Sequence, residues 1–201
     1  MTNIQFYTHP QSRGCTVRWM FEELGIAYDA HILDYGTTMK EQSYLDINPM
    51  GKVPAIVHNG KVVTETSAIC LYLADAFFDK GLAPALCDRA DYYRWSLFIA
   101  GPFESAFIDG FRKLEIKPEE RIMLGYGTIE EMMTILANHL KNREFVAGDK
   151  FTAADCLVGA FCAFAIFKGG LENEILKDYC LRLSERPAYK RARAIDEALV
   201  K

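Results

Sequence analysis

The sequence lacks the long apolar run of roughly 20 residues that a helix needs to span a bilayer. Its start, MTNIQFYTH, has no basic segment followed by an apolar one, so we expect no secretory signal. The formal net charge of −4 provides no basic footprint for nucleic acid. No segment repeats at a fixed period. These absences predict a cytoplasmic protein with neither a membrane nor a nucleic acid as its partner.

Paired cysteines of the kind found in metal and redox motifs are also absent. No two cysteines have the C-x-x-C spacing, and several lie in apolar helical patterns. The six cysteines are Cys15, Cys70, Cys87, Cys156, Cys162 and Cys180. We therefore expect reduced, mostly buried thiols and no bound metal.

What the sequence does contain is typical of a protein with a sizeable core. Half of its residues are apolar and a quarter are charged, and 201 residues suffice for two small domains. The pattern changes at DKGLAPALC, where Gly81 and Pro84 indicate a linker. We predict an α/β domain over residues 1–79, a linker over 80–87 and an all-helical domain over 88–201.

Hydrophobic periodicity predicts the individual elements. The first domain has the order β-α-β-α-β-β-α, which implies a sheet with helices on both faces. Predicted helices in the second domain cover residues 88–114, 118–142, 152–167, 171–184 and 188–199. Pro102 should bend or break the first of these helices. The helix over 152–167 is apolar nearly all round, so we expect it to be buried on every side.

The chemistry is concentrated in residues 48–69, NPMGKVPAIVHNGKVVTETSAI. Pro54 stands at the mouth of a strand and keeps Val53 extended, so the backbone of Val53 is free to pair with a small peptide as an added strand. The helix that begins at Thr66 offers unpaired N–H groups to a carboxylate, and Glu65 is positioned to hold an ammonium group. The pattern predicts a site for an amino-acid-headed peptide, with an ordinary hairpin and capped helix as the alternative.

This run resembles the glutathione site of the glutathione S-transferase family, in which a valine precedes a cis-proline and an acidic residue followed by Ser or Thr opens the third helix. The matching motifs are NPxGKVPA, ETSAI and FTAAD, and the resemblance covers essentially the whole chain. It implies a thioredoxin-like first domain, a cytosolic homodimer, and glutathione as co-substrate in conjugation or detoxification. The glutathione-binding residues that it implies are Lys52, Val53, Pro54, Glu65 and Thr66.

A transferase must stabilise the glutathione thiolate with a hydrogen-bond donor. Ser12 precedes the first helix, and the segment YTHPQSRGCTVRW resembles that of serine-type transferases. Tyr7, at the end of the first strand, is the alternative donor, as is a backbone N–H. Cys15 is a further candidate because a cysteine at a helix N-terminus has a lowered pKa, which would make the protein a thiol-disulfide reductase.

Two further predictions concern the helical domain. Phe103, Phe107 and Phe111 are candidates to line an apolar electrophile pocket between the domains, with plain core packing as the alternative. Thr152 and Asp155 form a capping box that starts the most apolar helix, and we assign it a structural role.

The sequence therefore predicts a glutathione transferase that conjugates a small, largely apolar electrophile. A glutathione-dependent isomerase or a thiol-disulfide reductase on the same fold is one alternative. A non-catalytic binding module of this fold is another.

Overall fold

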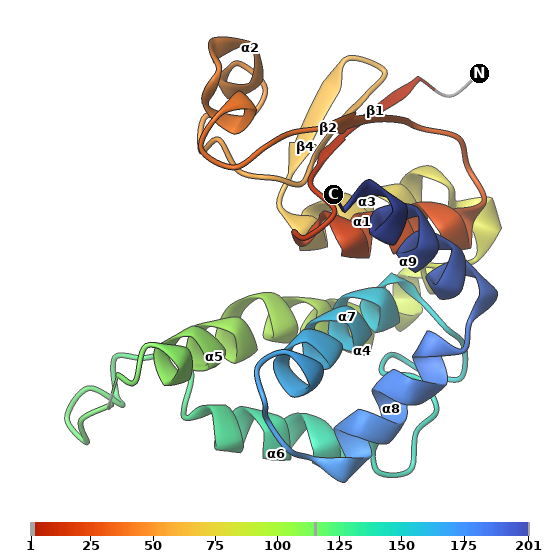
Figure 1. Ribbon diagram of the computed structural model, residues 1–201. Helices are drawn as coiled ribbons and strands as arrows, with labels where there is room; N and C mark the ends of the chain where they lie inside the picture. The colour runs from red at the N-terminus through yellow and green to blue at the C-terminus, as the bar shows by residue number, and fades with distance from the viewer. Residues whose placement is uncertain (1–2, 115, 201) are drawn as a thin grey trace. The chain divides into compact units, whose positions relative to one another are not determined.

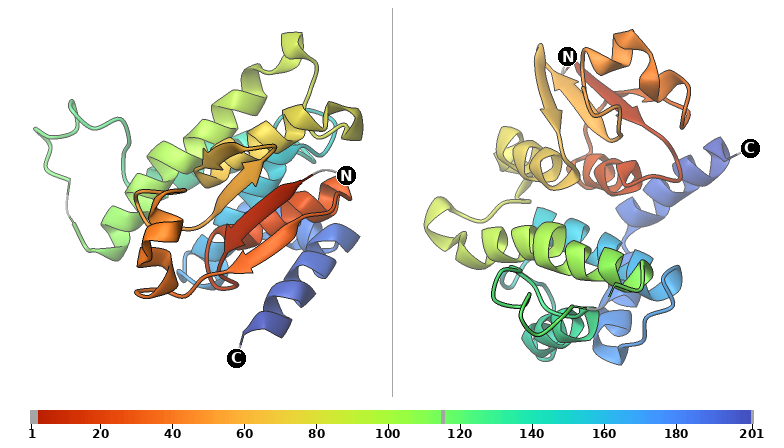
Figure 2. Two further views of the ribbon diagram at one scale, coloured as in Figure 1. Left: turned by 90° about the horizontal axis from the view of Figure 1, so that it is seen from above. Right: turned by 90° about the vertical axis from the view of Figure 1, so that its left-hand side faces the viewer.

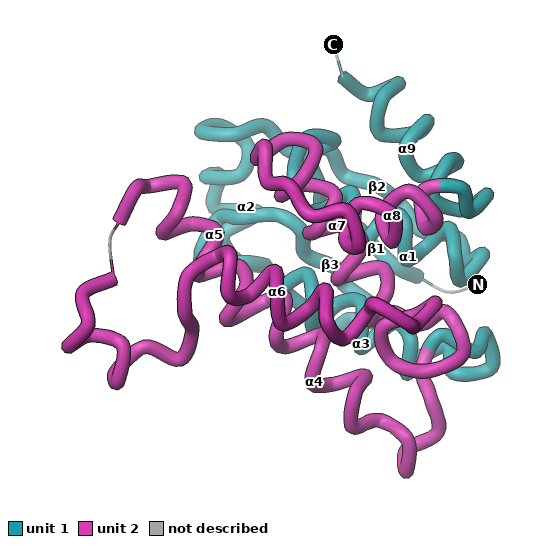
Figure 3. The backbone as a smooth tube through the Cα atoms, turned by 90° about the horizontal axis from the view of Figure 1, so that it is seen from below, with its two compact units in different colours: residues 1–82, 185–201 teal, residues 83–184 magenta. Residues whose placement is uncertain are grey.

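A computed structural model describes residues 3–114 and 116–200 (Figure 1). Among these residues, no helix has both the length and the apolar character that crossing a bilayer requires. Residues 1–82 and 185–201 form one compact unit, unit 1, and residues 83–184 form a second, unit 2 (Figure 3). The division after Leu82 falls inside the predicted linker, but the last helix belongs to unit 1 and not to the helical unit.

Unit 1 has the predicted strand and helix order, which confirms the fold class. Its sheet has the order β2-β1-β3-β4, with β1 parallel to β2 and antiparallel to β3, and β3 antiparallel to β4. The elements are β1 Ile4–Thr8, α1 Gly14–Leu24, β2 Asp29–Ile32, α2 Gln42–Leu45, β3 Ala55–His58, β4 Lys61–Thr64, α3 Thr66–Ala76 and α9 Pro187–Leu199, with short 3-10 turns at Thr38–Lys40 and Phe78–Lys80.

The two faces of β1 have different neighbours. Ile4, Phe6 and Thr8 are buried, whereas Gln5 and Tyr7 are half-buried on the opposite face. Helices α1 and α3 lie against one face of the sheet and α2 lies on the other (Figure 1). The Phe6 ring meets the Phe21 ring of α1 edge-on, with centroids 5.2 Å apart. The alternation of the strand therefore sends its apolar side chains into the core beneath α1.

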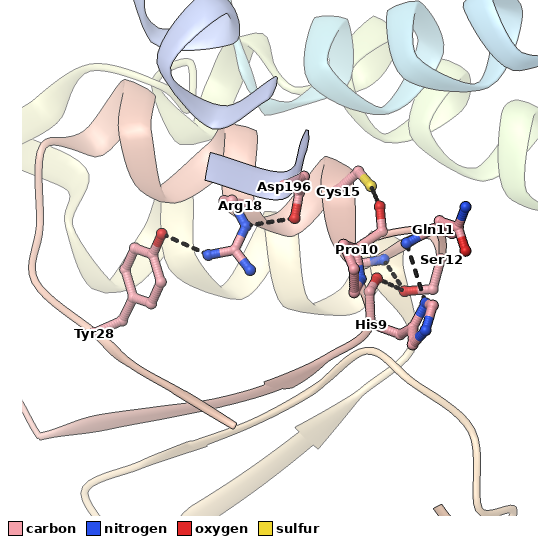
Figure 4. Close-up of polar contacts among 9 residues, drawn as sticks. His9, Pro10, Gln11, Ser12, Cys15, Arg18, Tyr28 and Asp196 are labelled. Carbon is pink, nitrogen blue, oxygen red and sulfur yellow. Dashed lines mark hydrogen bonds and ion pairs between the residues drawn. The ribbon is translucent and has the colours of Figure 1, made fainter. Parts of the chain in front are cut away.

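Helix α9 packs against α1, although the sequence placed it in the helical bundle. Asp196 of α9 and Arg18 of α1 form a buried ion pair, with Oδ1 and Nε 2.7 Å apart (Figure 4). The Trp19 and Tyr189 rings meet edge-on at 5.0 Å between centroids. An amphipathic pattern shows that a helix has a face to bury but does not identify the surface that receives it.

Unit 2 is helical throughout its described elements. They are a 3-10 turn Leu86–Asp88, α4 Ala90–Phe98, a π-helical segment Ile99–Phe103, α5 Glu104–Phe111, α6 Ile129–Leu140, α7 Ala153–Phe167 and α8 Glu174–Ser184. Pro102 lies within the π-helical segment, which is the local disruption that the proline predicted.

The predicted helix over 118–142 begins only at Ile129, about three helical turns later than expected. Figure 2 shows the segment before α6 as an extended loop. Ile122 is 90% exposed, so this apolar residue does not pack in the core although its spacing fits a helix. Thr128 and Glu131 form a capping box that fixes the start of α6, and the glycines before it disfavour helix.

The predicted capping box at the start of α7 is present. The Thr152 N–H donates to Asp155 Oδ2 over 2.8 Å, and the Thr152 hydroxyl lies 3.0 Å from the same oxygen. Asp155 also accepts from the Val146 N–H and from the Tyr179 hydroxyl, each over 2.7 Å. Burial raises the pKa of Asp155, and these hydrogen bonds oppose that rise. The carboxylate therefore ties the start of α7 to the preceding loop and to α8.

Candidate functional site

Strand register brings three segments to one end of the sheet of unit 1. Tyr7 lies opposite Ala55, and Ala55 lies opposite Thr64. The antiparallel pairing therefore places Thr8, Pro54 and Glu65 side by side at this end of the sheet. The loop before α1, the mouth of β3 and the start of α3 all meet here.

Side chains in and around α2 make hydrogen bonds to the loop before Pro54. The Lys52 carbonyl accepts from the Tyr44 hydroxyl over 2.5 Å and from Asn48 Nδ2 over 2.7 Å. Lys40 Nζ donates to the Gly51 carbonyl over 3.0 Å. Burial raises the pKa of Tyr44 to about 12, so its hydroxyl keeps the proton that it donates. These contacts hold the backbone at Val53 in a defined position.

The backbone of Val53 is available for pairing. Neither its N–H nor its carbonyl makes a hydrogen bond to another residue in the described part of the chain. Val53 stands before β3, and β4 ends at Thr64, so neither strand covers it. Its peptide bond to Pro54 is cis. An extended peptide could therefore pair with Val53 in the manner of an added strand.

Glu65 and Thr66 form the entry to α3. Glu65 has φ of 67° and ψ of 120°, a conformation that costs a non-glycine residue of the order of 1–3 kcal/mol. Its side chain is exposed, and Thr66 is half-buried. The first N–H groups of α3 have no intrahelical partners, and they face this end of the sheet as donors for an anion.

Ser12 caps α1. Its hydroxyl donates to the His9 carbonyl over 2.7 Å and accepts from the Gly14 N–H over 3.0 Å (Figure 4). A Cβ at Gly14 would lie 1.9 Å from Thr8 Oγ1, so this turn requires glycine. The hydroxyl lies at the positive end of the helix, but its single proton is given to a backbone carbonyl.

Tyr7 lies on the other face of the sheet from α1. Its ring stacks on His31 of β2 with centroids 4.7 Å apart, and it lies 5.5 Å from the Tyr44 ring. The buried cluster around Met39 and Tyr44 packs against it. This packing favours Ser12 over Tyr7 as the donor near α1, and the choice remains a prediction.

Cys15 is half-buried in the first turn of α1. Its Sγ donates to the Pro10 carbonyl over 2.9 Å (Figure 4). Burial, followed by the nearby Asp196 carboxylate, raises the pKa of the Cys15 thiol to about 12. The thiol therefore stays protonated at neutral pH, which argues against Cys15 as a nucleophile.

Alkylation offers a direct test of that conclusion. We expect iodoacetamide at neutral pH to modify the exposed Cys87 and to spare Cys15 in the folded protein. Raising a thiol pKa from 9.0 to about 12 lowers its thiolate fraction by about 10³-fold, and only the thiolate reacts. Peptide mass spectrometry after timed labelling measures both sites in one sample. Equal rates at the two cysteines would contradict the protonated state of Cys15.

Other predicted residues occupy different surroundings. The Lys52 side chain is exposed. Phe103 and Phe107 are buried in unit 2, where each meets the Phe161 ring edge-on, and Phe111 is 78% exposed. Their role at an electrophile pocket stays a prediction. Within the described residues, no group of His, Cys, Asp and Glu side chains is arranged to hold a metal ion.

Sequence reasoning missed Tyr35, which the structure places at the loop before α1. Its ring lies over His9 with centroids 4.7 Å apart. Burial and Cys15 raise the pKa of Tyr35, whereas hydrogen bonding with the Ser12 side chain lowers it. The adjacent Gly36, which signals a turn, was the only indication in the sequence that this segment is tightly folded.

Comparison with known families adds to this geometry. The family model described as "Glutathione S-transferase, N-terminal domain" matches residues 15–76, and "Glutathione S-transferase, C-terminal domain" matches residues 109–187. A probable glutathione S-transferase of Nicotiana tabacum is 30% identical over 166 residues, which cover 80% of this chain and 70% of the relative. The disulfide-bond oxidoreductase YghU of Escherichia coli is 28% identical over 217 residues, which cover 96% of this chain and 75% of the relative.

Solved structures with the same fold are also similar over nearly the whole chain. A sphingomonad glutathione S-transferase complexed with glutathione has a TM-score of 0.79 and 25% identity, and the match covers 96% of this chain and 98% of that one. A glutathione transferase from Methylococcus capsulatus has a TM-score of 0.80 and 23% identity, covering 97% and 99%. The second likeness concerns the fold alone.

Proposed function

This chain belongs to the glutathione S-transferase family, and from that premise we propose that it transfers the thiol of glutathione to a small, largely apolar electrophile. The observation that carries the proposal is the unpaired backbone of Val53 beside the open start of α3. The glutathione main chain pairs with Val53, and its γ-glutamyl carboxylate meets the N–H groups at Thr66. Glu65 holds the ammonium group, and Lys52 pairs with the glycyl carboxylate.

Ser12 then stabilises the thiolate. Its hydroxyl rotates from the His9 carbonyl to the sulfur, since a charged acceptor makes the stronger hydrogen bond. The thiolate attacks the electrophilic carbon and forms a carbon–sulfur bond. In a substitution the leaving group departs from that carbon with its bonding electron pair, and in an addition the displaced electron pair stays on the electrophile. Binding both reactants together lowers the entropic barrier to this step. Phe103, Phe107 and Phe111 are the candidates for contact with the electrophile.

A glutathione-dependent reductase is the second candidate, favoured by the name of the Escherichia coli relative. In that reaction the same thiolate attacks a disulfide sulfur, and a thiolate leaves. The high pKa of Cys15 supports a reaction that uses the thiol of glutathione and not a protein thiol. Turnover of a small disulfide against turnover of an aryl halide separates the two reactions. Homodimer formation and a cytoplasmic location complete the proposal, on the family resemblance.

The decisive experiment replaces Ser12 by alanine. We expect turnover to fall about 10²-fold, as it does when one donor to a developing anion is removed. The affinity for glutathione, measured by calorimetry, should change little because the peptide contacts remain. Ser184→Ala is the matched control, since Ser184 Oγ donates to the Leu181 carbonyl at the exposed end of α8, far along the chain from the loop before α1.

Two outcomes would oppose the proposal. If the protein neither binds glutathione nor converts an electrophile, it is a non-catalytic binding module. Full turnover in Ser12→Ala, together with its loss in Tyr7→Phe, would assign thiolate stabilisation to Tyr7.

A further inference from the structure

The segment that carries Tyr35 is anchored to the end of β1. The Leu33 N–H donates to the Thr8 carbonyl over 2.9 Å, which continues the pairing of β2 with β1. The Asp34 N–H donates to the Thr38 hydroxyl over 2.7 Å, and Gly36 has φ of 76°. A left-handed residue at position 36 folds the chain back at this point. Tyr35 is therefore held beside the loop before α1.

The phenol of Tyr35 borders Ser12. Its ring rests on His9 with an interplanar angle of 54°, and 56% of the residue is exposed. Hydrogen bonding with the Ser12 side chain and the influence of Cys15 both act on the Tyr35 hydroxyl. The groups that face it are thus Ser12 and His9 from the loop and Cys15 from α1. A molecule bound at Ser12 would meet the open side of this phenol.

A second hydrogen-bond donor to the glutathione sulfur would supplement Ser12. Its proton goes to the His9 carbonyl, so donation to sulfur sacrifices an existing hydrogen bond. A thiolate sulfur can accept hydrogen bonds from more than one donor. The Tyr35 hydroxyl takes part in hydrogen bonding with the Ser12 side chain, so a sulfur held at Ser12 would also lie beside the phenol. A phenol, with an ordinary pKa near ~10, is far more acidic than a serine hydroxyl and is the stronger donor to an anion.

We propose that Tyr35 is a second catalytic hydroxyl, which donates its O–H to the glutathione sulfur beside Ser12. The inference rests on the proposed function and deepens it. The glutathione thiol loses its proton to water, and Tyr35 keeps its own proton throughout. Two hydroxyls, one from each side of the site, then share the negative charge on sulfur. Both hydrogen bonds lower the pKa of the bound thiol and so raise the fraction of bound glutathione that is present as the reactive thiolate.

The test uses Tyr35→Phe, which keeps the ring on His9 and removes only the hydroxyl. The ultraviolet absorbance of the thiolate, followed through a pH titration of the complex with glutathione, gives the pKa of the bound thiol. We expect this pKa to rise by about one unit, which lowers turnover about tenfold at pH values below it. Binding of glutathione should change less than about twofold, because no peptide contact is lost.

Two further variants complete the design. Tyr93→Phe is the matched control, because Tyr93 lies on α4 in unit 2, is 42% exposed, and accepts from Arg89 Nη1. The double variant Ser12→Ala/Tyr35→Phe should bring the thiol pKa close to that of free glutathione, near the ordinary value of about 8.5 for a thiol.

The possible results separate the two proposals. A bound-thiol pKa in Tyr35→Phe equal to that of the unaltered protein overturns the role of Tyr35 and leaves Ser12 as the donor. Loss of glutathione binding in Tyr35→Phe assigns Tyr35 to peptide binding and also overturns it. If the unaltered protein does not bind glutathione, the proposed function fails first, and the role of Tyr35 fails with it.

Discussion

Replacing Asp155 by alanine is expected to lower the free energy of unfolding of the protein by about 3–5 kcal/mol, because several buried donors lose a shared acceptor at once. Asp155 is fully buried, with an exposed fraction of 0%. Its two oxygens accept from the backbone of Val146 and Thr152 and from the Tyr179 hydroxyl. Val146, Thr152 and Tyr179 are all buried, so each of these donors would lose its acceptor inside the protein.

The second capping box provides the control. Thr128 and Glu131 make the same reciprocal arrangement at the start of α6, but on the surface. Thr128→Ala should cost only the usual ~1 kcal/mol of a lost helix cap. Urea unfolding followed by circular dichroism measures both variants. Equal losses in the two would show that Asp155 acts as a cap alone, and that its contacts with α8 and with residue 146 contribute nothing.

The fold was predictable because its elements have clear periodicity. Alternation in β1 is confirmed. The prediction that α7 is buried on every side holds for its first half, whereas Phe164 and Phe167 in its second half are 49% and 52% exposed. The start of α6 was predicted wrongly, because the spacing of Ile122 fits a helix that nothing covers. Periodicity reports where apolar residues fall along the chain, whereas a helix also needs a surface on which to bury them.

The candidate site was only partly predictable for a related reason. The segment around Val53 and Pro54 is local, so proline chemistry and hairpin signals identify it from a few adjacent residues. Tyr35 approaches Ser12 only because β2 pairs with β1, a contact between residues that are distant in sequence. Asp196 reaches Arg18 across 178 positions of the chain. Such pairs have no signature in the spacing of either residue.

The second large effect is expected at that ion pair. Arg18 and Asp196 have exposed fractions of 1% and 2%, so Asp196→Ala leaves a guanidinium buried without its carboxylate. We expect a loss of about 3–5 kcal/mol in the free energy of unfolding. The rings of Phe6 and Tyr28 lie beside the guanidinium, at 5.4 and 5.8 Å from their centroids, but do not replace the missing charge.

The same two helices contain the control pair. Arg191 of α9 contacts Glu22 of α1 over 3.0 Å, but the Arg191 side chain is 54% exposed. Arg191→Ala should therefore cost less than about 1 kcal/mol. A double variant, Arg18→Met with Asp196→Leu, removes both buried charges and should regain most of the loss, because apolar side chains of similar size tolerate burial. Urea unfolding of the unaltered protein, of the single variants Arg18→Met and Asp196→Leu and of the double variant completes a double-mutant cycle, which gives the coupling between Arg18 and Asp196.

Alkylation of Cys15 links this stability test to the candidate site. In Asp196→Ala the thiol loses a carboxylate that raises its pKa, and a loosened α9 exposes it. Labelling of Cys15 should therefore become faster than in the unaltered protein, whereas Arg191→Ala should leave its rate unchanged. A stability loss in Asp196→Ala no larger than that in Arg191→Ala, with Cys15 still unreactive, would mean that α9 is held by its apolar contacts and that the buried ion pair has no part in shielding the start of α1.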